Sequence, residues 1–192
     1  MSTFASVSSS RVEQAVLILF ADLTRFMVNS RATPDAALAD LLDGYYRHAE
    51  GLVSGSGGRV VKFMGDAFLA VWPEAGAGDG VEALPALKRD IDAWWAGKGW
   101  DSRVVLKAHF GRAVVGPFGA DARFDVIGNE VNVAATLPAR TVSLSAEAFR
   151  CLEAGRRRAF KKHTDPWSTS RSTMRDPDRS GRALSPPTNP GG

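Results

Sequence analysis

The sequence lacks several features that mark whole classes of protein. Its 192 residues include a single cysteine, Cys151, so an internal disulfide framework is excluded and a reducing compartment is expected. The longest apolar run near the start covers residues 15–21, ends at Asp22, and is too short to span a bilayer. The pattern of a signal peptide is also missing. These absences predict a cytoplasmic protein with no membrane partner.

A dominant charge of one sign is missing from most of the chain. The net charge of +3 hides an uneven distribution, because residues 156–192 hold nine basic and three acidic residues. That segment carries +6 and the remainder carries −3. A basic balance confined to one end is weak support for nucleic-acid binding, so no nucleic-acid partner is expected.

The composition predicts one folded domain with two looser ends. Hydrophobic residues make up 44% of the chain, which is enough for one domain with a core. The first ten residues are rich in Ser, and the residues after Asp165 almost lack apolar side chains. We therefore expect a flexible arm over 1–11, a folded domain over 12–165 and a disordered basic tail over 166–192.

The apolar pattern predicts an α+β fold. A helix is expected to start at Thr33-Pro34, with Thr33 as its cap, and Gly65 is expected to form a tight hairpin connection. Ser145 is expected to cap a last short helix. Strands are expected at 15–20, 59–63, 67–72, 104–110, 113–118 and 142–144, and further helices at 84–96 and 129–137. This order is a ferredoxin-like βαββαβ core with appended C-terminal elements.

Two aspartates stand where expected strands end or turn. Asp22 follows the first buried strand, and Asp66 lies in the hairpin beside it. Carboxylates at such places hold Mg²⁺, and two that converge repel each other unless a cation lies between them. An aspartate taken singly at either place is more often an ordinary cap or turn residue.

A third segment, residues 123–135, reads as a strand, a turn and a helix. Gly128 opens the helix, and the helix presents Asn132. Taken by itself, this segment is also unremarkable as sequence, and it gains meaning only beside the other two.

Together the three segments resemble the class III nucleotidyl cyclase catalytic domain, over roughly residues 14–165. Their order and internal spacings match the family's motifs at once. The resemblance implies that Asp22 and Asp66, with Leu23 beside them, bind two Mg²⁺ or Mn²⁺ ions. It implies that Lys62 and Asp125 read adenine and that Asn132 orients the ribose.

The base-reading pair predicts ATP as the substrate. Lysine donates to a ring nitrogen, and aspartate accepts from the exocyclic amine of adenine. Guanine has the reverse polarity and would favour an acid in place of Lys62. The resemblance further implies a triphosphate contact from Lys161, and the expected helix start predicts a phosphate cradle of backbone amides. The cradle residues are Leu23, Thr24, Arg25 and Phe26.

The resemblance implies an adenylate cyclase with sites shared between two chains. The ribose 3′-hydroxyl attacks the α-phosphorus and pyrophosphate leaves. In the family one chain supplies the metal aspartates and the other supplies the base readers and the asparagine. A homodimer would therefore contain two equivalent sites.

One position departs from the family. Thr136 stands where the family has an arginine that stabilises the transition state, and threonine supplies no charged fork. Arg140, one turn further on, is either a replacement or a plain surface residue. Two alternatives follow: a degenerate domain that binds ATP and acts as a regulatory or pairing subunit, and a ferredoxin-like nucleic-acid binder. The second alternative lacks the aromatic strand signature of such modules.

Overall fold

The computed structural model describes residues 10–159, so Lys161 and the tail predicted over 166–192 lie outside the described residues. The strands are β1 (Val12–Leu23), β2 (Arg59–Met64), β3 (Ala67–Pro73), β4 (Val104–Phe118), β5 (Arg123–Ile127) and β6 (Val142–Leu144). The α-helices are α1 (Phe26–Ser30), α2 (Asp35–Gly55), α3 (Ala77–Gly97), α4 (Asn129–Thr136) and α5 (Ala146–Arg150). Short 3₁₀ helices cover Glu74–Gly76 and Arg156–Ala159.

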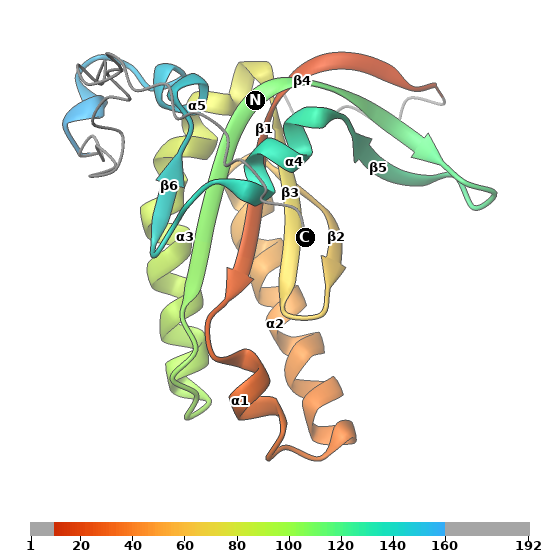
Figure 1. Cartoon of the computed structure of the whole chain (residues 1–192), viewed down its shortest axis with the longest axis vertical. Coiled ribbons are helices and arrows are strands. Elements are labelled where there is room, and N and C mark those ends of the chain that lie inside the picture. The colour runs from red at the N-terminus through yellow and green to blue at the C-terminus, as the bar shows by residue number, and fades with distance from the viewer. Residues whose placement is uncertain (1–9, 160–192) are drawn as a thin grey trace, which may run out of the picture. The chain divides into compact units, whose positions relative to one another are not determined.

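The strands form one sheet in the order β2-β3-β1-β4-β5, and β6 pairs in parallel with β4 (Figure 1). The first four strands in this order, with α2 and α3 as the crossovers, are the predicted ferredoxin-like core. The α+β prediction with appended C-terminal elements is therefore confirmed. The β2–β3 hairpin lies next to β1, because β3 pairs antiparallel with β1 from Val16 to Ala21.

Helices α2 and α3 bury an aromatic-rich layer against one face of the sheet. Tyr45 of α2 and Trp95 of α3 are fully buried, with ring centroids 5.1 Å apart. Gly80 lets α3 approach closely, since a Cβ there would lie 2.8 Å from side-chain atoms of Leu17 and Trp72. This layer packs on β1 and β3, which matters because β1 ends and β3 begins near the candidate site.

The opposite face carries a smaller apolar cluster covered in part by α4. Its buried members are Val16, Ile18, Leu69, Val71, Ala113, Val115, Val126 and Ala134. Strand alternation places Phe20 and Asp22 of β1 on the same face as Val16 and Ile18. Asp22 is exposed there, so the metal-pair candidate lies on the side of the sheet that α4 occupies.

Three expected elements differ from the structure. The strands expected at 104–110 and 113–118 are one strand, β4, because β1 pairs with it without a break through Gly111. Helix α3 begins at Ala77 rather than 84 and contains Pro85, since Ala77, Gly80 and Val81 are buried against the sheet. Thr33 does not cap α2, because its hydroxyl donates to the Asn29 carbonyl.

Two other local predictions, at Gly65 and at Ser145, are confirmed. Gly65 forms the hairpin turn with a φ of 67°, in the left-handed region. Ser145 caps α5 by accepting from the Ala148 amide at 3.1 Å. No helix within residues 10–159 is long and apolar enough to cross a membrane.

Candidate functional site

The two predicted metal aspartates line the same cavity. Asp22 is the penultimate residue of β1, and Asp66 lies in the hairpin turn between β2 and β3. Because β3 pairs beside β1, the turn brings Asp66 to the end of β1. The cavity has a volume of about 470 Å³ and is lined by Asp22, Leu23, Arg25, Phe26, Met27, Ser30 and Asp66. The long-range pairing of strands therefore brings together two residues that are 44 positions apart in the sequence.

The electrostatics of Asp66 reflect this proximity. Burial raises the pKa of Asp66 above its ordinary value, and the charge of Asp22 raises it further. Hydrogen bonds from the backbone of Asp66 and Leu23 act in the opposite direction. Two carboxylates held close together in a partly buried place repel each other when both are ionised, and a bound cation would remove this repulsion.

Two tyrosines of α2, Tyr45 and Tyr46, lie close to the hairpin turn that contains Asp66. Tyr46 stacks on Phe63 with ring centroids 3.9 Å apart and donates from its hydroxyl to the Gly65 carbonyl at 2.7 Å. Tyr45 is fully buried, and among the described residues its hydroxyl has no hydrogen-bond partner. Burial raises the pKa of Tyr45, and the charges of Asp66 and Asp22 add to the rise. Tyr46 therefore anchors the turn that presents Asp66.

The turn after β1 is fixed by the loop before β4. The Thr24 amide donates to the Arg103 carbonyl at 2.9 Å, and Arg25 pairs with Asp101 at 2.9 Å. Arg25 has a φ of 60° at the start of α1. The Thr24 amide is therefore already bonded and is not open to the predicted phosphate cradle.

The two predicted base readers contact each other. The Lys62 ammonium lies 2.9 and 2.8 Å from the two carboxylate oxygens of Asp125. Asp125 Oδ1 also accepts from the Val126 amide at 2.8 Å. The pair joins β2 to β5, two strands that are not hydrogen-bonded neighbours in the sheet. The structure thus brings Lys62 and Asp125 to one place, as the resemblance requires.

Helix α4 presents Asn132 and Thr136 on its exposed side. Both side chains are exposed, while Ala134 packs against the sheet. The Thr136 hydroxyl donates back to the Asn132 carbonyl at 2.8 Å, one turn earlier in the helix. Arg140 is exposed and follows the end of α4.

A contact between a buried histidine and a half-buried glutamate, which the sequence did not reveal, joins α4 to the sheet. His109 of β4 is 5% exposed, and its Nε2 lies 2.5 Å from Glu130 Oε2 in the first turn of α4. Gly111 makes room, because a Cβ there would lie 2.8 Å from Glu130 Cγ. The alternation of His109 and Gly111 on one face of β4 is the only local signal, and the partner lies 21 residues away.

Residues of the described part fit a divalent cation of the magnesium type. Within residues 10–159 no group of three or more His, Cys, Asp or Glu side chains is placed to hold a metal. Mg²⁺ is usually held by one or two carboxylates, with waters and substrate phosphates completing its shell. A pair of converging carboxylates beside the Leu23 backbone matches that pattern.

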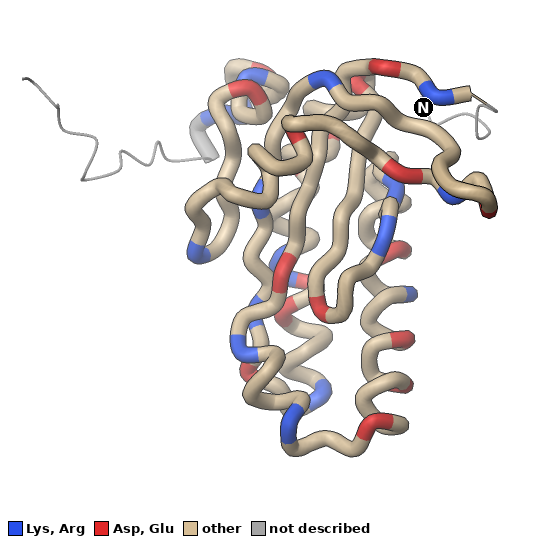
Figure 2. The backbone as a smooth tube through the Cα atoms, turned by 45° about the vertical axis from the view of Figure 1, so that its right-hand side comes forward, with Lys and Arg blue, Asp and Glu red and all other residues tan. Residues whose placement is uncertain are grey.

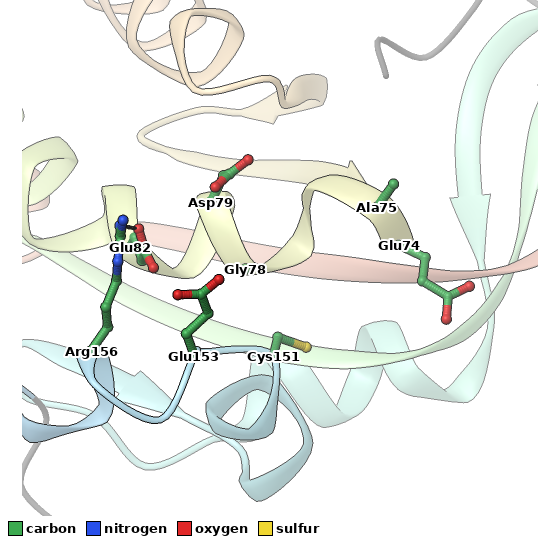
Figure 3. A pocket seen from close by; sticks show the side chains of 8 residues that line it. All are labelled: Glu74, Ala75, Gly78, Asp79, Glu82, Cys151, Glu153 and Arg156. Atoms are coloured by element: carbon green, nitrogen blue, oxygen red, sulfur yellow. Dashed lines mark hydrogen bonds and ion pairs between the residues drawn. The ribbon is translucent and has the colours of Figure 1, made fainter. Parts of the chain in front are cut away.

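A second cavity offers no comparable chemistry. It has a volume of about 280 Å³ and lies where the start of α3 faces the segment after α5 (Figure 3). Arg156 forms an ion pair with Glu82 inside it, so part of its acidic lining is already neutralised.

The acidic surface of α2 gives no support to the nucleic-acid alternative. Acidic positions recur along this helix (Figure 2), which contains four acids and one arginine. Phosphate backbones are bound by basic surfaces, so this long helix is a poor candidate for such a contact.

Comparison with known proteins gives a fold but no sequence family. No protein-family model and no curated protein matches the sequence. Solved structures do match, among them the adenylyl cyclase CyaB from P. aeruginosa, with 24% identity and a TM-score of 0.66 over 74% of this chain and 82% of that chain.

A bacterial light-regulated adenylyl cyclase matches with 19% identity and a TM-score of 0.66 over 76% of this chain, which spans 47% of that one. The guanylyl cyclase Cya2 matches with 20% identity and a TM-score of 0.63 over 74% of this chain and 80% of that one. The chain therefore has the fold of class III nucleotidyl cyclase catalytic domains.

Proposed function

We propose that this chain is an adenylate cyclase that converts ATP to 3′,5′-cyclic AMP and pyrophosphate at sites shared within a homodimer. The observation that carries the proposal is the double convergence on one sheet: Asp22 with Asp66, and Lys62 with Asp125. Both pairs unite segments that are distant in sequence, and both match roles in the family that the fold resembles. Fold alone does not decide function, so the proposal rests on these residues.

The chain's own residues bind and orient the nucleotide. Lys62 donates to a ring nitrogen of adenine, and Asp125 accepts from the exocyclic amine. Asn132 orients the ribose so that its 3′-oxygen faces the α-phosphorus, which makes the reaction intramolecular. The 3′-oxygen forms a bond to phosphorus, the bond to the β-phosphate oxygen breaks, and the hydroxyl proton leaves to solvent.

Asp22, Asp66 and the Leu23 carbonyl hold the divalent ions in this proposal. Two bound Mg²⁺ or Mn²⁺ ions would lower the pKa of the 3′-hydroxyl and neutralise the triphosphate. The phosphate chain is received by the backbone amides of the turn at Arg25 and Phe26.

The site is completed by a second copy of the chain. The cavity beside the aspartates is lined by β1, α1 and the hairpin, and its lining does not include Lys62, Asp125 or Asn132. Two apolar side chains of α1 are exposed here: Met27, which lines the cavity, is 67% exposed, and Val28, the next residue, is 62% exposed. We expect the base readers of a partner subunit to cover this region. Sedimentation that finds only monomer with Mn²⁺ and an ATP analogue present would argue against this arrangement.

The direct test is product formation. The purified full chain with ATP and Mn²⁺ is expected to release cyclic AMP, whereas the Asp22→Ala variant is expected to release none. GTP serves as the competing substrate. Equal product from the wild type and the variant would exclude the proposed chemistry.

One observation favours a second candidate, a domain that binds ATP and regulates or pairs with another subunit. Thr136 stands where the family has an arginine, and its hydroxyl is bonded within the helix to the Asn132 carbonyl. Tight binding of an ATP analogue with Mn²⁺, combined with absent turnover, would favour this candidate.

A further inference from the structure

The reaction proposed above needs a positive charge near the α-phosphorus. Negative charge builds on the equatorial phosphoryl oxygens in the transition state, and loss of an arginine that stabilises it costs about 10³- to 10⁵-fold in rate. Thr136 supplies no charge, and its hydroxyl already donates to the Asn132 carbonyl at 2.8 Å. A basic side chain from another element would have to fill this role.

The side chain of Lys107 on β4 reaches the last turn of α4, next to Thr136. Its ammonium donates to the carbonyl of Ala135 at 2.9 Å, and Ala135 directly precedes Thr136. The side chain is half-buried rather than free in solvent. The cation therefore lies at the last turn of the helix that presents Asn132.

The same ammonium also lies beside the strand that carries Asp22. Lys107 is directly opposite Phe20 in the pairing of β4 with β1, and its Nζ is 5.8 Å from the centre of the Phe20 ring. Phe20 and Asp22 alternate onto one face of β1. The contact with Phe20 therefore holds the ammonium beneath the end of α4, on the face of the sheet that this helix covers. In the proposed dimer, the metal pair that α4 faces belongs to the second copy of the chain.

We propose that Lys107 is a catalytic residue that contacts the α-phosphoryl oxygens in the transition state and supplies the charge missing at Thr136. The inference rests on the proposed function. One of the three ammonium donors is used on Ala135, which leaves two for phosphoryl oxygens. Lys107 stays protonated throughout, so the bond changes and the proton balance of the reaction are those given above.

Arg140 is a weaker candidate for this role. Its side chain is exposed, and it lies beyond Leu137, where α4 has already ended. Lys107, in contrast, has its charge held at the helix by a defined bond. That bond also stabilises the helix terminus, since a cation is favourable at the C-terminal end of a helix. The experiment must therefore separate a capping role from a catalytic one.

A double-mutant cycle of Lys107→Met and Thr136→Arg makes this separation. We expect Lys107→Met to lower kcat about 10²- to 10³-fold, the loss typical of one charge-stabilising donor, with little change in KM for ATP. Lys107→Arg keeps the charge and should retain most of the rate. Thr136→Arg should raise the kcat of the wild type less than about threefold. In the Lys107→Met background it should restore kcat to near the wild-type value, since the two cations are redundant. Lys98→Met, at an exposed lysine directly after α3, is the matched control and should leave kcat and KM for ATP unchanged.

Two results overturn the proposal. One is a Lys107→Met variant that folds, as judged by its melting temperature, and keeps its kcat. The other is the same gain from Thr136→Arg in both backgrounds, which a capping role predicts. If Lys107→Met does not fold, the single Thr136→Arg variant decides, because a gain of 100-fold or more in the wild-type background excludes a working Lys107.

Failure of the proposed function would look different. A wild type that makes no cyclic AMP overturns the role of Lys107. If Thr136→Arg then makes cyclic AMP, the proposed reaction and its other residues survive. If neither protein makes product and neither binds an ATP analogue with Mn²⁺, the adenylate cyclase proposal fails as well.

Discussion

The two charged pairs of this domain are built on opposite principles. Lys62 and Asp125 neutralise each other through two contacts of 2.8 and 2.9 Å. Asp22 and Asp66 bring two negative charges to one cavity, and the charge of Asp22 helps to raise the pKa of Asp66. The first pair is complete by itself, whereas the second is balanced only when a cation joins it. In the proposed function, the first pair is the base-reading half of the site and the second pair is the metal-dependent half.

The largest expected effect comes from breaking the aspartate pair. Asp66→Asn should lower cyclic AMP formation about 10³-fold or more, since a bound metal contributes several kcal/mol of charge stabilisation. The same variant should melt at a higher temperature than the wild type without metal, because the repulsion from Asp22 is removed.

Asp125→Asn is the matched control for that comparison. It removes a carboxylate that already has a cation, so it should lower the melting temperature rather than raise it. Differential scanning calorimetry measures both melting temperatures. Equal shifts of the melting temperature in Asp66→Asn and Asp125→Asn would show that the two charged pairs do not differ in this way.

The next effect concerns the base. Lys62→Glu should lower kcat/KM for ATP about 10- to 100-fold, the range of one good base contact, and shift preference toward GTP. Lys62→Met should lose ATP activity without gaining GTP activity. Competition assays with both nucleotides measure the preference, and an unchanged ratio in Lys62→Glu would remove Lys62 from base reading.

A smaller effect should follow from loosening α4. Glu130→Ala leaves the buried His109 without its 2.5 Å partner, and an unpaired buried polar group costs about 1–3 kcal/mol. Glu147→Ala, which removes a carboxylate 3.8 Å from His109 Nδ1, should cost less than about 1 kcal/mol. Urea unfolding of both variants measures the difference, and similar losses would contradict the special role of the His109–Glu130 contact.

The smallest effect should come from the tyrosines behind Asp66. Tyr46→Phe loses the bond to the Gly65 carbonyl and should destabilise the fold by about 0.5–1.5 kcal/mol, with weaker Mn²⁺ binding. Tyr45→Phe removes a hydroxyl that has no partner among the described residues, so its stability should stay the same or rise. A larger loss in Tyr45→Phe than in Tyr46→Phe would reverse this assignment.

Local patterns in the sequence predict the core of the fold well. The order of strands and helices, the Gly65 turn and the Ser145 cap all depend on short-range chemistry, and the structure confirms them. The site segments depend on more than such local patterns. Each one taken singly is an ordinary strand end, turn or helix start, and only their order and spacing together carry the family resemblance. Their roles remain proposals that the experiments above address.

Tertiary contacts explain what the sequence does not reveal. The sequence predicts two strands on either side of Gly111-Arg112, but continuous pairing with β1 carries β4 through both residues. The start of α3 is set by burial against Leu17 and Trp72 rather than by a local signal. The hydrogen bonds of His109 to Glu130 and of Lys107 to Ala135 join residues 21 and 28 positions apart. Short-range patterns, which cover only a few turns of helix or one strand, therefore cannot predict them.

Direct binding of Mn²⁺ tests the central claim, that Asp22 and Asp66 form a metal site. Titration of the full chain with Mn²⁺, followed by electron paramagnetic resonance with an ATP analogue present, should give saturable binding. The binding should be lost in Asp22→Ala and in Asp66→Ala but kept in Lys62→Met. Wild-type binding that persists unchanged in both aspartate variants would contradict the account.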